Sequence, residues 1–101
     1  MSFPLGQLVM TSTLHHYQQR YPALEQFCLE SLGRHQRCDW GSCSAQDQYS
    51  NQLALEGDCG RILSVYPLPM HLKGLAYLPD DRIWILTYPG HSTTLLFPSE
   101  Y

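Results

Sequence analysis

Charged side chains are scarce in this sequence, at 15% of its 101 residues, whereas about a quarter is usual for a soluble domain. Only six residues are lysine or arginine, and Arg34 and Arg37 form their one close pair. Because a protein that binds nucleic acid needs a concentrated basic surface to meet the phosphates, we expect no direct nucleic-acid partner. The nine acidic residues are also scattered, apart from Asp80 and Asp81, which argues against an acidic mimic of DNA.

Long apolar runs are missing as well. No run approaches the roughly 20 residues that a membrane-spanning helix needs, and the first six residues have neither the basic start nor the apolar stretch of a secretory signal. We therefore expect a cytoplasmic protein without a membrane partner. In that compartment disulfides are rare, so the four cysteines, Cys28, Cys38, Cys43 and Cys59, should be reduced thiols.

A strong metal motif is also lacking. Four candidate ligands, His35, Cys38, Cys43 and Cys59, have a spacing that partly suits tetrahedral zinc, but they include no Cys-x2-Cys pair. Ordinary buried or partly exposed thiols explain these cysteines more simply. We expect neither a metal nor any other cofactor.

Nothing in the sequence marks a catalytic centre of high specificity. Cys38 with His35, or Ser92 beside His91, would supply a nucleophile and a base, but neither pair lies in a nucleophile elbow or a glycine-rich oxyanion loop. Five histidines and many serines make such pairs common by chance. We expect no enzymatic activity. The alternative is a small hydrolase or toxin that uses His35 and Cys38.

What the sequence does contain is a set of short β-rich runs. Residues 61–66, 82–88 and 92–97 are dense in β-branched and aromatic side chains and are bounded by proline and glycine, which is typical of strands. Residues 5–11 are a further β-compatible run. Pro89-Gly90-His91 predicts a hairpin turn between the last two strands.

Helical spacing of apolar residues predicts helices within 12–35, broken or kinked at Pro22, and within 44–57. Together these elements predict one α+β domain over residues 1–101, in the order β-α-α-α-β-β-β. We expect a mainly antiparallel four-stranded sheet with two to three helices packed on one face. The expected core consists of Leu8, Met10, Leu24, Phe27, Leu32, Trp40, Leu53, Leu63, Val65, Ile83, Ile85, Leu95 and Phe97.

Two segments are candidates for binding a partner. In the loop after the first helices, Trp40 and Arg34 are of the residue types that dominate interface hot spots, although a tryptophan between two helices more often closes the core. Residues 67–81 combine three prolines with many large apolar side chains. Large exposed apolar patches mark interaction sites. The alternatives for this segment are a lid over the sheet and a homodimer seam. Its candidate contact residues are Leu68, Met70, Leu72, Tyr77 and Leu78.

Several pieces of the chain resemble a family of small proteins encoded by plasmids, prophages and other mobile elements. The matching pieces follow one order along nearly the whole chain: Leu8-Val-Met-Thr11, Ser31-Leu-Gly-Arg-His35, Asp39-Trp-Gly41, Asn51 with Ala54-Leu55, Arg61-Ile-Leu-Ser64, Ile83-Trp-Ile-Leu-Thr87 and residues 93–101. The Leu/Pro-rich stretch 67–81 departs from the family's pattern, as do Cys38, Cys43 and Cys59.

The family has no settled activity, so the resemblance implies a biological setting only. Mobile elements of this kind often carry small proteins that blunt host defence, including anti-CRISPR proteins. We therefore expect a non-catalytic inhibitor that binds a host defence complex, such as a CRISPR effector, and occludes its surface. A transcriptional or antitoxin-like regulator is a further alternative, although the few basic residues argue against contact with DNA.

Overall fold

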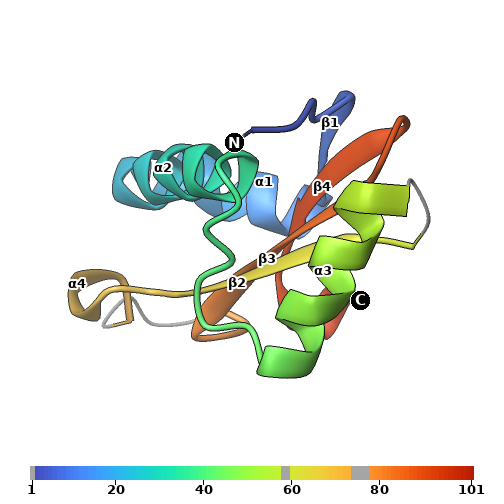
Figure 1. Ribbon diagram of the computed structural model, residues 1–101. Helices are drawn as coiled ribbons and strands as arrows, with labels where there is room; N and C mark the ends of the chain where they lie inside the picture. The colour runs from blue at the N-terminus through green and yellow to red at the C-terminus, as the bar shows by residue number, and fades with distance from the viewer. Residues whose placement is uncertain (1, 58–59, 74–77) are drawn as a thin grey trace.

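The computed structural model of the chain describes residues 2–57, 60–73 and 78–101. Four strands form one sheet: β1 (Gln7–Met10), β2 (Ile62–Pro67), β3 (Arg82–Tyr88) and β4 (Ser92–Leu96). The helices are α1 (Ser12–Arg20), α2 (Pro22–Gln36), α3 (Ala45–Gly57) and the short α4 (Met70–Lys73), and a 3₁₀ helix, η1 (Pro98–Glu100), follows β4 (Figure 1).

The sheet is mixed, in the order β1-β4-β3-β2. β2 and β3 pair antiparallel, and so do β3 and β4, whereas β1 runs parallel to β4. The predicted mainly antiparallel sheet with two to three helices was therefore wrong, because one of its pairs is parallel and four helices accompany it. The Pro89-Gly90 turn joins β3 to β4 as predicted, with Gly90 at a φ of 81°.

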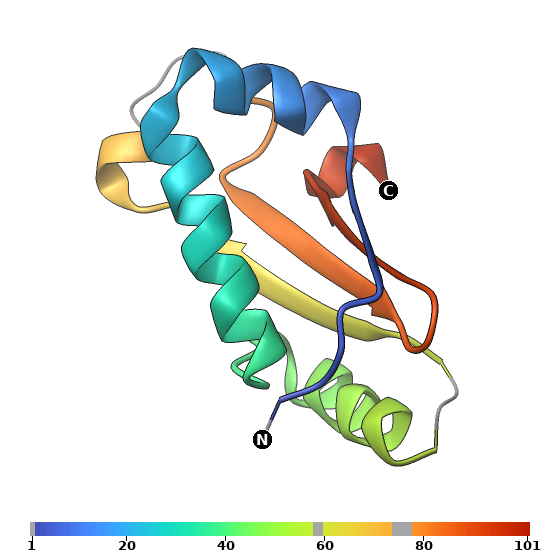
Figure 2. The same ribbon diagram turned by 90° about the horizontal axis from the view of Figure 1, so that it is seen from above.

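Proline and an extended backbone divide the first helical region into α1 and α2. Tyr21 lies between them with φ −128° and ψ 94°, and Pro22 is the first residue of α2. A residue before proline is driven out of the helical region, while proline itself suits the first helical position. The two helices consequently meet at an angle, which is visible from above (Figure 2).

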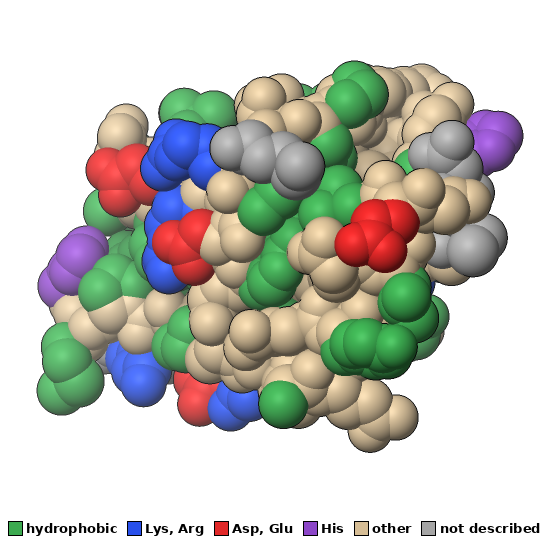
Figure 3. All heavy atoms as spheres, viewed as in Figure 1, with side chains coloured by type: hydrophobic (Ala, Val, Ile, Leu, Met, Phe, Trp, Pro, Cys, Tyr) green, Lys and Arg blue, Asp and Glu red, His purple; other side chains and the backbone are tan. Residues whose placement is uncertain are grey.

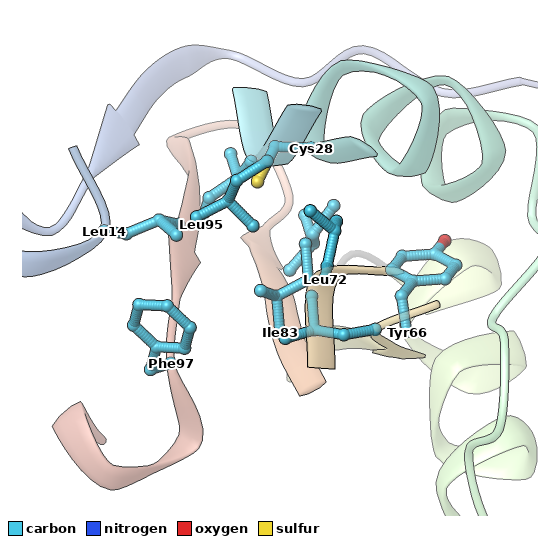
Figure 4. Close-up of a cluster of buried hydrophobic side chains, with 10 residues drawn as sticks. Leu14, Cys28, Tyr66, Leu72, Ile83, Leu95 and Phe97 are labelled. Carbon is cyan, nitrogen blue, oxygen red and sulfur yellow. The ribbon is translucent and has the colours of Figure 1, made fainter. Parts of the chain in front are cut away.

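One face of the sheet carries the largest apolar cluster. The strand residues Tyr66, Ile83, Ile85 and Leu95 lie on this face, together with Phe97 just after β4. They pack with Leu14 of α1 and with Leu24 and Cys28 of α2 (Figure 4). A smaller cluster of Leu63, Val65, Leu86 and Leu96, joined by Cys43, lies on the opposite face. This two-sided burial explains why β2 is apolar along most of its length rather than alternating with polar residues.

Burial departs from the predicted core at two leucines. Leu8 of β1 is 53% exposed and Leu53 of α3 is 46% exposed, so their assignment to the core was wrong. Met10, Phe27, Leu32 and Trp40 are partly buried. The remaining predicted core residues, Leu24, Leu63, Val65, Ile83, Ile85, Leu95 and Phe97, are buried.

The outer edge of β2 is sealed by α3 and by the loop that precedes it. The side chain of Asn51 accepts a hydrogen bond from the Leu63 amide at 2.9 Å and donates one to the Leu63 carbonyl at 2.7 Å. Two residues along, the Val65 amide donates to the Trp40 carbonyl, and the Val65 carbonyl accepts from the Ser42 amide. The backbone groups that Leu63 and Val65 would otherwise present to another chain are thus paired within the protein.

This sealing predicts that Asn51 is a large contributor to stability. Replacing Asn51 with alanine leaves a buried donor and acceptor of Leu63 without partners, so Asn51→Ala should lower the free energy of unfolding by about 2–3 kcal/mol. The matched control is Gln52→Ala, because Gln52 is exposed and bonds only to exposed Glu56; it should change that value by less than about 0.5 kcal/mol. Equal effects of the two changes in urea unfolding would contradict the role of Asn51.

Candidate functional site

A buried polar network joins α2 to three strands. His35 is fully buried, and its Nδ1 lies 2.5 Å from the Ser64 hydroxyl of β2 while its Nε2 lies 2.8 Å from the Thr87 hydroxyl of β3. Thr87 in turn lies 2.7 Å from the Thr93 hydroxyl of β4, which donates to the Leu5 carbonyl at 2.6 Å. Every buried side-chain polar atom among the described residues has a partner.

The network fixes the direction of each hydrogen bond. A carbonyl only accepts, so Thr93 donates to Leu5, Thr87 donates to Thr93, and the Thr87 oxygen accepts from His35 Nε2–H. Neutral His35 therefore carries its proton on Nε2, and Nδ1 accepts the Ser64 hydroxyl proton. Burial lowers the pKa of His35 to about 4, which keeps the ring neutral at physiological pH.

A serine hydroxyl that donates its proton to a histidine is also the arrangement of a catalytic nucleophile and its base. Here, however, a substrate cannot reach the pair. Ser64 and His35 are both fully buried, and neither lines a pocket among those found in the described residues. Both ring nitrogens of His35 are already bonded to Ser64 and Thr87. The geometry thus does not support the alternative in which His35 serves as a base for Cys38.

Cys28, Cys38 and Cys43, the thiols within the described residues, show no activation as nucleophiles either. Burial raises the pKa of Cys28 and of Cys43 to about 11, and it also raises the pKa of Cys38. A thiol needs a lowered pKa to react at neutral pH. Within residues 2–57, 60–73 and 78–101, no three His, Cys, Asp or Glu side chains lie close enough to hold a metal ion; Cys59 lies outside these residues.

Arg34 lies in the last turn of α2, and Trp40 lies in the tightly bonded loop that follows this helix. The Arg34 guanidinium makes two hydrogen bonds to the Asp39 carboxylate, at 2.8 and 3.3 Å, which lower the pKa of Asp39. It also lies over the Tyr66 ring, 4.8 Å from its centre, and Trp40 is partly buried against Phe3 and His35. Each of the two predicted binding residues therefore has a structural role in holding this loop against β2.

The close approach of this loop to β2 depends on Gly41. Its φ is +69°, and a Cβ at this position would lie 2.0 Å from the Val65 carbonyl oxygen. Only glycine tolerates both this backbone conformation and this contact. The motif Asp39-Trp40-Gly41 is thus explained by packing: a carboxylate for Arg34, a ring for the core and a glycine beside β2.

Within the described parts of the segment 67–81, residues 67–73 and 78–81, buried residues lie among exposed ones. Leu68 and Leu72 are almost completely buried in the main cluster (Figure 4), and Leu78 is partly buried against it. Met70, at the start of α4, is 82% exposed. Tyr77 lies outside the described residues. The structure thus places Leu68 and Leu72 in a lid over the sheet, and among the described contact candidates of this segment Met70 is the exposed one.

Next to α4 lies a hollow that the sequence did not indicate. It has a volume of about 410 Å³ and is bounded by α2 on one side and by the start of α4 on the other, with Ala23, Gln26, Phe27, Glu30, Pro69 and His71 as its lining. Ala23, Phe27 and Glu30 recur at helical spacing on α2, but nothing in the sequence places them beside Pro69. The pairing of these two segments results from the tertiary fold.

Titration of His35 should make stability depend on pH. Its pKa falls from 6.5 to about 4 on folding, so between these values the unfolded chain takes up a proton that the folded chain does not. Stability is therefore full above about pH 6.5 and decreases as the pH falls to about 4, by an amount on the order of 3 kcal/mol. In denaturant unfolding, His35→Gln should flatten this slope, whereas exposed His15→Gln should preserve it. A wild-type slope in His35→Gln would contradict the assignment.

Burial of Leu72 predicts a sharp contrast within α4. Leu72→Ala removes a fully buried side chain and should cost about 2–5 kcal/mol of unfolding free energy. Met70→Ala, two residues earlier, should change it by less than about 0.5 kcal/mol because the side chain lies in solvent. Thermal unfolding of the two variants tests the lid directly, and a negligible loss for Leu72→Ala would rule it out.

Comparisons with known proteins add no assignment to this geometry. No family model matches the chain, and no match was found among the curated proteins or the solved structures. Across residues 2–57, 60–73 and 78–101, no helix combines the length and the apolar character needed to cross a bilayer. The resemblance to proteins of mobile elements therefore stays a prediction.

Proposed function

We propose that this protein is a non-catalytic inhibitor of the anti-CRISPR kind, which binds a host defence complex in the cytoplasm and occludes one of its surfaces. The observation that carries the proposal is the exposed side chain of Met70, which lies in the chain between Pro69 and His71, two residues that line the hollow beside α4. Methionine adapts to irregular partner surfaces and is common at binding sites. The setting of a mobile element comes from the resemblance in sequence.

Met70, which we call the docking tip, is held in place by buried residues on both sides. Leu68 and Leu72 are buried on either side of Met70, so the exposed side chain projects from a short element that is anchored in the core. Anchoring lowers the conformational entropy that a contact residue loses on binding. A partner protein with an apolar projection would fill the hollow, while its surface covers Met70.

The distribution of charge favours a protein partner over nucleic acid. On the face seen in Figure 3, acidic and basic side chains lie in small groups among neutral polar and hydrophobic ones. The net charge is −3, whereas phosphate recognition requires clustered cations. A contact of mixed polar and apolar character is what protein interfaces use.

An inhibitor that occludes a surface can be told from a catalytic inactivator by the amount of protein needed for inhibition. In a cleavage assay with a purified CRISPR effector that the protein inhibits, residual activity should fall linearly with added protein and reach its minimum near equimolar amounts. A catalytic inactivator would instead act at a small fraction of the effector concentration and with time. Expression of the chain should also restore plating of a phage that the CRISPR system of the host targets; failure to do so with every effector class tested would refute the inhibitor function.

Met70→Asp tests the docking tip, because it would bury a charge in an apolar contact. It should weaken inhibition by about tenfold or more, since removing a central hot-spot contact costs at least 1.4 kcal/mol. Tyr49→Asp is the matched control, as Tyr49 is also exposed but lies on α3. Both variants should unfold at the temperature of the wild type. Unchanged inhibition by folded Met70→Asp would place the contact elsewhere.

A further inference from the structure

The two edge strands of the sheet, β2 and β1, differ in whether their outward backbone groups have hydrogen-bond partners. The outer edge of β2 is closed by Asn51 and by the Trp40–Ser42 loop, whereas β1 lies at the upper margin of the molecule beside β4 (Figure 1). The amide of Gln7, at the start of β1, donates to the carbonyl of His91 just before β4, and the amide of Thr11, just after β1, donates to the carbonyl of Leu95 in β4. Because backbone groups alternate in direction along a strand, the N–H and C=O of Leu8 point away from β4.

No described residue pairs with these outward groups of Leu8. The hydrogen bonds of the described chain include none to the Leu8 backbone from the outer side, and Leu8 and Val9 of this edge are exposed. An unpaired strand edge is a template for another strand. The occupant that completes it is therefore an extended backbone, rather than a helix or a small molecule.

Three features that commonly prevent edge pairing, namely a charged residue, a proline and a bulge, are absent from this four-residue strand. Natural proteins place lysine, proline or a bulge on exposed edges, but β1 is Gln7-Leu-Val-Met10 and pairs with β4 in unbroken register. Residues 1–19 contain no charged side chain, the first being Arg20. Two copies of this edge would meet without like-charge repulsion, whereas nothing in it would select a charged foreign strand.

An apolar hollow accompanies the edge on the side covered by α2. It has a volume of about 360 Å³, and Leu8, Met10, Cys28, Leu29, Leu32 and Leu95 form its apolar lining, with Gln18 and Glu25 at its polar part. Leu8 shares this side of the sheet with its neighbour in register, Thr93. A second strand added beside β1 would place its own apolar side chain at the mouth of the hollow.

We propose that the protein forms a two-fold symmetric dimer in which β1 pairs antiparallel with β1 of a second copy, centred on Leu8. Antiparallel pairing lets two facing residues exchange both backbone hydrogen bonds, so Leu8 of each copy donates to and accepts from Leu8 of the other. The same surface serves on both copies, as a two-fold interface requires. The two sheets then join into one, and each Leu8 covers the edge of the neighbouring hollow.

The dimer is independent of the proposed function, since β1 and Met70 are separate surfaces. Sedimentation equilibrium of the full chain over a range of concentrations should show reversible association to twice the 11.6 kDa chain mass. Leu8→Lys, which sets two like charges across the axis, should raise the dissociation constant about tenfold or more. Leu53→Lys, at an exposed leucine of α3, should leave it unchanged.

A charge-swap pair identifies the contact residue. Leu8→Lys and Leu8→Glu should each dimerise more weakly alone, while their equimolar mixture should associate more tightly than either variant, because opposite charges then face each other at the axis. In the unchanged chain, hydrogen exchange at the Leu8 amide should slow as protein concentration rises, which tests the pairing without any substitution. A chain that stays monomeric, a Leu8→Lys variant with the dissociation constant of the unchanged chain, or Leu8 exchange independent of concentration would each overturn the proposal.

Discussion

The rest of the structure depends on the hydrogen-bonded chain that begins at Ser64 and ends at the Leu5 carbonyl. It runs through His35, Thr87 and Thr93, and so fastens α2 to β2, β3, β4 and the segment before β1. Each member donates to the next, starting from the Ser64 hydroxyl, and such one-way chains strengthen their bonds mutually. A buried imidazole is costly without partners; with both nitrogens satisfied it fixes the position of α2 over the sheet more specifically than apolar packing would.

The same hydrogen-bonded chain gives Ser64 and His35 a structural role in place of a catalytic one. A serine beside a histidine suggests catalysis, yet here the pair is sealed under α2 and its protons are committed to neighbouring oxygens. Arg34 at the end of α2 and the loop residues Asp39 and Trp40 also have structural roles, because they bond to one another and to β2. Because these polar and aromatic groups are bonded within the protein, the candidate contact surfaces lie at its periphery. They are the edge of β1 and the exposed Met70 of α4.

Local features of the fold could be predicted from the sequence, and non-local ones could not. Helical periodicity, Pro22 and the Pro89-Gly90 turn specify α1, α2, α3 and the β3–β4 hairpin, because each depends on neighbouring residues. The partner of β1 is β4, more than 80 residues away in the chain, and no local pattern encodes that parallel pairing. For the same reason Leu8 was assigned to the core: alternation shows that a strand has an apolar side, but not how far the covering helices extend. His35, which looked like a candidate ligand or base, owes its role to Ser64 and Thr87, both distant in sequence.

The segment 67–81 shows why apolar content alone does not identify an interface. Leu68, Met70 and Leu72 all have hydrophobic side chains, yet Leu68 and Leu72 are buried in the core while Met70 lies in solvent. A chain of this length has a limited core, because it buries only about 60–70% of its unfolded surface. The lid enlarges this core with Leu68 and Leu72, and it exposes Met70, which lies between them. An element attached in this way can acquire a binding residue at little cost to the fold, because substitutions at the exposed position leave the buried leucines undisturbed. Contact function is therefore most readily placed at such a tip, next to side chains whose burial is already required for stability.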